Sequence, residues 1–150
     1  MKDTVVVRIN GPLERVAELF ADPSKNTSWM DDVERYEPLS GEQGLPGSTY
    51  RLIPRKGSLV FTATVLERNL PHELRLRLEA SSVAVDVHAT LSTLATGQTR
   101  LVSEEEFEFK GLAKLFSLFA RPAIRRAHRR HMEAFKQFAE RKLDIGSATT

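Results

Sequence analysis

The chain has 150 residues, of which 41% are hydrophobic and 28% charged, a composition ordinary for one globular domain. It contains no cysteine, which excludes disulfides, thiolate metal sites and a cysteine nucleophile. No apolar run approaches the roughly 20 residues that span a bilayer, and the first residues lack the apolar core of a secretory signal, so we expect a cytoplasmic protein.

The net charge of +2 conceals an uneven distribution. Residues 113–142 carry nine Lys and Arg against two Glu, a balance of +7, so the remainder carries 13 against 18, a balance of −5. A basic C-terminal segment therefore follows a mildly acidic body.

The N-terminal part predicts one strand followed by two short helices. Alternating β-branched residues make Thr4–Ile9 a strand. Pro12 occupies a first-turn position, where its missing N–H costs nothing, and opens a helix. Asp22 followed by Pro23 repeats this signal and opens a second short helix toward Trp29.

The middle of the chain is a series of short segments in which apolar and polar residues alternate. Stretches rich in glycine and proline, such as residues 41–47, separate them. Parallel pairing would need crossover segments, and none is present, so the strands should pair in antiparallel fashion. The expected strands are Val33–Leu39, Tyr50–Pro54, Leu59–Leu66, Leu74–Ala80, Val83–Leu91 and Thr99–Phe109.

One long helix, Leu112–Lys142, is predicted near the end of the chain, followed from Gly146 by a small polar tail that should fray. Pro122 removes a backbone hydrogen bond and should kink the helix. Leu115 and Leu118 lie off the apolar stripe of the later turns, which agrees with a break at the proline.

A lone long helix has to bury its apolar stripe on the sheet, because no other large surface exists. We therefore predict an α+β fold in which a curved antiparallel sheet wraps around the C-terminal helix. Residues 1–145 should form this single domain, and a sheet that wraps around a helix tends to leave a cavity between the two.

The last predicted strand contains an anomaly on its inner face. Leu101, Ser103, Glu105 and Phe107 alternate with outward residues, so a carboxyl group should lie in or beside the cavity. Desolvation should raise the pKa of Glu105, which suits a general acid or base or an anchor for a ligand. The alternatives are an ion pair with an inward arginine, or a bulge that exposes Glu105.

His131 falls on the apolar side of the long helix, where it could donate to a ligand or titrate near neutral pH. A hydrogen-bonded core histidine is the plainer alternative. His128 and His131 are spaced as a metal-binding pair, but no clear third ligand follows, so we expect neither a metal nor another cofactor. Trp29 and Tyr50 are suited to the rim of a pocket or to ordinary packing.

The arginines of the long helix are dense enough to suggest an anionic partner. No aromatic residues interleave with them on the exposed side, so we do not expect nucleic-acid binding. Two alternative interpretations of the arginines remain: a solvated helix face, and intramolecular pairing with the glutamates at 104, 106 and 108. So does a weak contact with an anionic membrane surface or a protein, through Arg121, Arg125 and Arg129.

Several segments together resemble the helix-grip superfamily, which includes START domains, the birch-pollen-allergen fold and polyketide cyclases. The resemblance is strongest to the bacterial polyketide cyclase/dehydrase-like branch and spans about residues 3–142. It implies the fold described above but no shared catalytic motif. The segments that carry it are Val5–Ile9 running into Gly11 and Pro12, Phe20–Pro23 with Trp29, Gly44–Tyr50, Val65–Glu67 with Pro71, and the terminal helix.

These observations favour a binding module for a lipid, polyketide or aromatic metabolite, as a monomer or a homodimer. The rival hypothesis is a polyketide cyclase or dehydratase that uses Glu105 or His131 for proton transfer. A third is a partner-binding protein that acts through its basic helix. The residues expected to bind the ligand are Trp29, Tyr50, Leu76, Val85, Val87, Leu101, Ser103, Glu105, Phe107, Ile124, His131 and Phe135.

Overall fold

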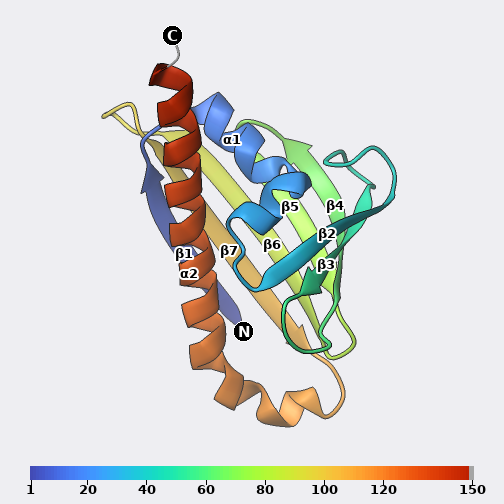
Figure 1. The fold of residues 1–150 in the computed structure, drawn as a ribbon. Coiled ribbons are helices and arrows are strands. Elements are labelled where there is room, and N and C mark those ends of the chain that lie inside the picture. The colour runs from blue at the N-terminus through green and yellow to red at the C-terminus, as the bar shows by residue number, and fades with distance from the viewer. Residues whose placement is uncertain (149–150) are drawn as a thin grey trace.

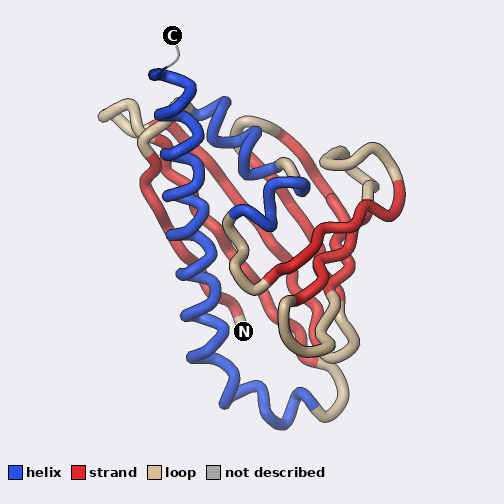
Figure 2. Tube along the Cα trace, viewed as in Figure 1, coloured by secondary structure: helices blue, strands red, loops and turns tan. Residues whose placement is uncertain are grey.

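The computed structural model describes residues 1–148, which form one antiparallel sheet, two α-helices and one 3₁₀ helix (Figures 1 and 2). The predicted α+β helix-grip architecture is confirmed, with two short helices directly after the first strand. The elements are β1 (Lys2–Ile9), α1 (Leu13–Ala21), η1 (Pro23–Ser28), β2 (Val33–Ser40), β3 (Thr49–Pro54), β4 (Phe61–Asn69), β5 (Glu73–Glu79), β6 (Val83–Thr93), β7 (Thr99–Phe109) and α2 (Ala113–Ala148).

The strands of the sheet follow the order β1-β7-β6-β5-β4-β3-β2. Consecutive strands from β2 to β7 are therefore neighbours, as short antiparallel connections require. The strand β1 joins the far side of β7, so the chain crosses the concave face through α1 and η1 to reach β2. Pro38 lies in β2, an edge strand where a missing N–H is tolerated.

Register shifts bend the sheet around the helices. They occur twice between β2 and β3 and once between β4 and β5, at Val65 and Glu67. Each adds a residue to one strand and increases its local twist, which curves the sheet. The long pair β6 and β7 keeps a regular register, so alternate residues of both strands face the concave side.

The later turns of α2 pack on β1, β7 and α1. Their buried stripe contains Met132, Phe135, Ala139 and Leu143 at helical spacing. The first turns project past the end of the sheet, and the helix axis bends in the region of Pro122, as predicted (Figure 1). The helix continues to Ala148, so the tail that we expected to fray from Gly146 is helical up to that residue, and residues 149–150 lie outside the described part.

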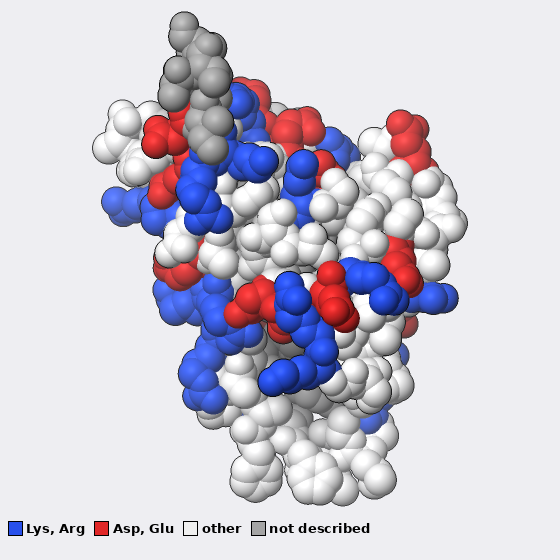
Figure 3. Space-filling view, viewed as in Figure 1, with Lys and Arg blue, Asp and Glu red and all other residues white. Residues whose placement is uncertain are grey.

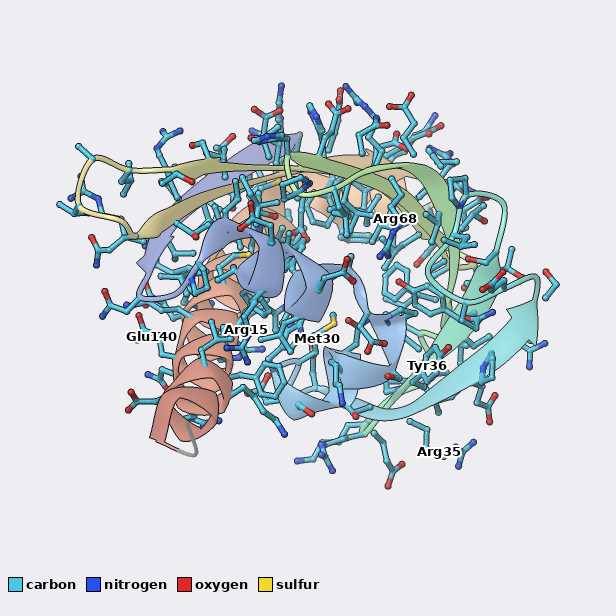
Figure 4. The ribbon with its side chains drawn as sticks, turned by 90° about the horizontal axis from the view of Figure 1, so that it is seen from above. Arg15, Met30, Arg35, Tyr36, Arg68 and Glu140 are labelled. Atoms are coloured by element: carbon cyan, nitrogen blue, oxygen red, sulfur yellow. The ribbon has the colours of Figure 1, made fainter. Side chains whose placement is uncertain are left out.

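Polar side chains fasten the helices to the sheet at one end of the concave face. Arg68 of β4 donates to the carboxylate of Glu18 in α1 at 3.1 Å and to the carbonyl of Gly44 at 3.3 Å. On the other side, Glu140 of α2 accepts the backbone N–H of Asn10 at 2.8 Å. Seen from above, Arg68 and Glu140 lie on opposite sides of α1 (Figure 4).

An aromatic cluster fills the space beneath α1 and η1. The ring centroids of Phe20 and Phe135 lie 5.0 Å apart, and that of Trp29 lies 5.7 Å from Phe20 and 5.4 Å from Phe135. Phe135 is fully buried. A second, separate apolar cluster consists of Val83, Val85 and Val87 on β6. The apolar core is therefore fully packed beneath α1. Farther along the sheet, the valine cluster of β6 is separate from it.

No helix within the described residues is both long enough and apolar enough to cross a bilayer.

We expect Phe135→Ala to lower the free energy of unfolding by about 3–5 kcal/mol, because it removes the central ring of the aromatic cluster and leaves a cavity there. Phe116→Ala is the matched control, since that ring is exposed, and should change stability by less than about 0.5 kcal/mol. Urea unfolding followed by circular dichroism measures both. Equal losses in the two variants would contradict the described core.

Candidate functional site

A cavity of about 680 Å³ lies between the concave face of the sheet and the helices. Its walls come from strands β3 to β7 with the loop between β3 and β4, from the end of α1, from η1 with the loop after it and the first residue of β2, and from the turns of α2 between Ile124 and Met132. The hollow interior expected from the sequence is therefore present. It occupies the part of the concave face that the aromatic cluster leaves unfilled.

Most of the residues expected to bind a ligand line this cavity, although whether they bind one stays a prediction. Two do not line it. Leu101 and Phe135 are fully buried in the packed core, because the sheet beneath α1 is already filled by side chains from α1, η1 and α2. The expected residues that do line the cavity are Trp29, Tyr50, Leu76, Val85, Val87, Ser103, Glu105, Phe107, Ile124 and His131.

Three residues far apart in the sequence form a hydrogen-bonded chain on one wall. His128 of α2 is 1% exposed; its Nδ1 lies 2.9 Å from Oδ2 of Asp3, and its Nε2 lies 2.9 Å from Oγ of Ser103. A carboxylate can only accept, so Nδ1 carries the proton, and in the neutral ring Nε2 accepts the hydroxyl of Ser103. His128 and Ser103 both line the cavity.

The strand register explains why these groups meet. Asp3 of β1 lies directly opposite Glu105 of β7, and Val5 lies opposite Ser103. Directly opposed residues of an antiparallel pair point to the same face, so the carboxyl groups of Asp3 and Glu105 both face α2. The ring of His128 lies over them, with Nδ1 2.9 Å from Asp3 and 3.6 Å from Oε1 of Glu105.

Burial raises the pKa of Glu105 above its ordinary value, while the nearby His128 opposes the rise and Asp3 adds to it. The direction agrees with the expectation from the sequence. No arginine pairs with Glu105 among the described residues, and β7 keeps its register, so neither alternative to an inward Glu105 holds. The wall thus combines a carboxyl group of raised pKa with a histidine and a hydroxyl.

Tyr50 adds a second polar group to a largely apolar wall. Its side chain is buried, and burial raises the pKa of Tyr50 to about 12, so the hydroxyl stays protonated at neutral pH. Trp29 is also buried, and its Nε1–H finds no acceptor among the described residues. A buried donor without a partner is costly. Both aromatic residues belong to the interior wall and not to an exposed rim.

A separate set of charged side chains, which includes His131, forms the rim of the cavity. The Nε2 of His131 lies 2.8 Å from Oδ1 of Asp32, and Nε of Arg130 donates to the carboxylate of Asp31 at 3.1 Å. The hydrogen bond from His131 lowers the pKa of Asp32. Arg55 joins the same group through the carbonyl of Asp31 at 2.8 Å. The rim therefore ties α2 to the loop between η1 and β2.

His131, which the sequence favoured as the site histidine, is thus a rim residue bound to Asp32. His128 faces the interior instead. The helical spacing explains the difference: His128 precedes Met132, Phe135 and Ala139 by 4, 7 and 11 residues, in the middle of the buried stripe. His131 lies about 60° away from that centre at 100° per residue. The helical projection alone could have identified His128, but its partner Asp3 required the strand register.

The rim brings three possible metal ligands together, but they are not the pair of histidines considered from the sequence, because His128 is not among them. One atom each from Asp31, Asp32 and His131 lies within 4.8 Å of the others. Arg130 is paired with the same carboxylates, at 3.1 and 4.0 Å, and supplies positive charge there. The geometry of this group is therefore accounted for by ion pairing between α2 and the loop.

Some arginines of α2 have nearby acidic partners, although not those proposed from the sequence. Arg125 lies 3.8 Å from Asp3, and Arg129 lies 3.8 Å from Glu133 one turn later. These pairs are exposed on the arginine side and contribute little to stability. The glutamate at 104 pairs with Lys2 instead, and the one at 108 with Arg77.

Comparison with known structures identifies the fold. The chain is 19% identical to the Zhui aromatase/cyclase from Streptomyces sp. R1128, with a TM-score of 0.78 over 95% of this chain and 94% of that one. It is 15% identical to a START superfamily protein from Mycobacterium smegmatis, with a TM-score of 0.70 over 96% and 97%. Ara h 8.0201 is 11% identical, with a TM-score of 0.71 over 93% and 97%. At these identities the likeness concerns the fold alone.

A search of the curated proteins found no match to the chain. The profile of one protein family, described as polyketide cyclase / dehydrase and lipid transport, matches residues 2–140. That range includes the whole sheet, the cavity wall and the helix turn that carries His128. The chain therefore belongs to the polyketide cyclase/dehydrase and lipid transport family.

Proposed function

We propose that the protein binds a small, mostly apolar molecule that carries a hydroxyl or carbonyl group, and that this molecule occupies the cavity under α2. The observation that carries the proposal is the division of the cavity wall into a large apolar part and one interior polar corner. The volume of about 680 Å³ lies within the range of roughly 300–1,000 Å³ that is usual for small-molecule sites. The apolar part of the wall includes Leu52, Phe61, Leu74, Leu76, Leu78, Val83, Val85, Val87 and Phe107.

The polar corner, formed by Ser103, Glu105 and His128, would orient the ligand. A protonated Glu105 donates a hydrogen bond to a carbonyl or hydroxyl oxygen, and the hydroxyl of Ser103 can donate or accept. The unpartnered Nε1–H of Trp29 offers a further donor on the wall. A few directed polar groups in an apolar enclosure supply orientation, while burial of apolar surface supplies most of the affinity.

The family and the structural neighbours support this proposal at the level of chemical class. The family description names both polyketide cyclisation or dehydration and lipid transport, and each of these concerns molecules with long apolar or polyketone skeletons. One neighbour is an aromatase/cyclase, and another is a START superfamily protein. A lipid, polyketide or aromatic metabolite fits the size and the character of the cavity.

A second candidate function, proton transfer in a cyclase or dehydratase, is favoured by the polar corner itself. A carboxyl group with a raised pKa beside a histidine is an acid and a base in one enclosure. In the dehydration of a β-hydroxy ketone, Glu105 would give its proton to the departing hydroxyl, which leaves as water. The base would remove the α-proton, and the C–H electron pair would become the new double bond.

In this second candidate the base is His128 acting directly or through Ser103, and Asp3 holds the ring in position. His131 is not part of this corner. Acyl transfer with Ser103 as nucleophile is disfavoured, because Ser103 pairs with Val5 of β1 and Ala89 of β6 in the middle of the sheet. The backbone amides around it are used in strand pairing and do not form an oxyanion hole.

Val85→Trp should fill the cavity and weaken the binding of N-phenyl-1-naphthylamine, a fluorescent apolar probe, by at least about tenfold, because the site must enclose its ligand. Val6→Trp on the outer face of β1 is the matched control and should leave the probe affinity unchanged. Fluorescence titration measures both, with circular dichroism to confirm folding. Equal probe binding by the folded Val85→Trp variant would contradict the proposed site.

Glu105→Gln should make the protein more stable than wild type at pH 8, and the gain should shrink as the pH falls. The folded-state pKa of Glu105 is raised, so the folded wild type loses stability as the pH rises above the ordinary value of 4.5 and through the folded pKa. The neutral amide avoids this loss. Urea unfolding between pH 5 and pH 8 tests the expectation, with the exposed Glu106→Gln as the control; a pH-independent difference would refute it.

If the protein is a cyclase or dehydratase, Glu105→Gln should lower kcat on a synthetic poly-β-ketone thioester by about 10²–10⁴-fold, the usual contribution of a general acid. The affinity for N-phenyl-1-naphthylamine should change by less than about twofold, since the probe does not need the proton. The control variant Glu106→Gln should keep the kcat of the wild type on the same thioester. Undiminished kcat in Glu105→Gln, or no turnover by the wild type, would rule out this second candidate.

A further inference from the structure

The first turns of α2 expose an unusual concentration of large apolar side chains. Leu112 is 77% exposed, Leu115 70%, Phe116 63%, Leu118 64% and Phe119 82%. The other large apolar side chains that are exposed among the described residues lie between 39% and 47%. We refer to residues 112–119 as the apolar tip. An exposed apolar cluster of this kind marks an interaction surface.

The apolar tip does not contribute to the core, because it lies beyond the end of the sheet. Figure 1 shows the first turns of α2 extending below the strands and bending back at the helix start. Leu115, Phe116 and Phe119 span about 100° of the helix circumference at 100° per residue. Lys114 and Arg121 lie about 140–160° from Phe119, on the opposite side. The tip is therefore an amphipathic helix whose apolar side faces solvent.

The chain segment that carries the tip is charged with one sign only, although two of its basic residues have acidic partners on the strands: Lys110 lies 3.8 Å from Glu79, and Arg125 lies 3.8 Å from Asp3. Between Glu108 and Glu133 the sequence contains no acidic residue. Lys114, Arg121 and Arg126 take part in none of the ion pairs of the described residues. On the face shown in Figure 3, the lower end of the molecule is mostly uncharged, and Lys and Arg side chains gather above it. We refer to the residues Lys110, Lys114, Arg121, Arg125 and Arg126 as the basic collar.

We propose that the apolar tip and the basic collar dock the protein on the surface of an anionic lipid bilayer. Apolar side chains of an amphipathic helix enter the boundary between headgroups and acyl chains, and basic side chains beside them bind anionic headgroups. A second copy of the chain is a poorer occupant, because contact between two tips would bring two basic collars together. The complementary charge of an anionic bilayer removes this repulsion.

The docking surface adjoins the cavity. Ile124, which lines the cavity, follows Phe119 by little more than one helical turn. Docking would therefore bring this part of the cavity wall close to the bilayer. The inference concerns the surface of the protein alone and holds whichever ligand or reaction the cavity serves.

Co-sedimentation of the full chain with vesicles tests the proposal. Wild-type protein should bind vesicles of phosphatidylcholine and phosphatidylglycerol at least about tenfold more tightly than vesicles of phosphatidylcholine alone, since anionic headgroups attract the collar. The double substitution Phe116→Ser with Phe119→Ser should weaken binding to the anionic vesicles by at least about tenfold, because it removes apolar side chains that would enter the bilayer. Arg121→Glu with Arg126→Glu should have a comparable effect, which high salt should reproduce in the wild type.

Two matched controls separate docking from general changes of surface. Leu39→Ser with Leu66→Ser removes two exposed apolar side chains elsewhere, and Arg15→Glu with Arg100→Glu makes the same change of net charge on other elements. Both should bind anionic vesicles like the wild type. Equal binding by wild type and the Phe116/Phe119 variant, or equal binding to neutral and anionic vesicles, would overturn the proposal. So would a stable dimer in sedimentation velocity that the Phe116/Phe119 substitutions dissociate.

Discussion

The packing of α2 against one side of a curved sheet is the interaction on which the rest of the structure depends. The later turns of the helix bury a continuous stripe against β1, β7 and α1, and the aromatic cluster around Phe135 fills the space there. Toward β3 and β2 the sheet curves away from the helix, and the earlier turns of α2 do not pack against the concave face. The volume between the two cannot be filled by the short side chains of β6, so the molecule is solid at one end and hollow at the other.

The same packing creates the polar corner. His128 occupies the centre of the buried stripe, where an apolar residue would be expected, and the sheet beneath it presents Asp3, Ser103 and Glu105. A buried histidine is tolerated because both ring nitrogens are hydrogen-bonded. Glu105 has no comparable partner and shifts toward its neutral form instead. Groups held in this way are positioned before any ligand arrives, which suits both orientation of a bound molecule and transfer of a proton.

Much of the fold follows from local patterns, because β-branched alternation, proline at helix starts and glycine-rich turns each act over a few residues. The strands, the two short helices and the inward face of β7 could all be predicted in this way, as could the rise of the Glu105 pKa. His131 was expected to line the cavity and does so, but at the rim beside Asp32, since a rotation of about 60° on a helix is enough to move a side chain from the centre of the buried stripe to its edge. Leu101 and Phe135 were placed in the cavity because periodicity identifies the inner face but not which part of it other elements fill.

The amino-acid sequence by itself determined the elements, their antiparallel order and the need for the terminal helix to pack on the sheet, because these depend on short-range periodicity and on the burial of apolar surface. Only the tertiary structure decided which residues meet across that interface. Asp3 and His128 are 125 residues apart, and their contact depends on the pairing of β1 with β7 and on the rotation of α2. The register of strands and the rotation of a helix are set by the packing of the whole molecule, which no local pattern encodes.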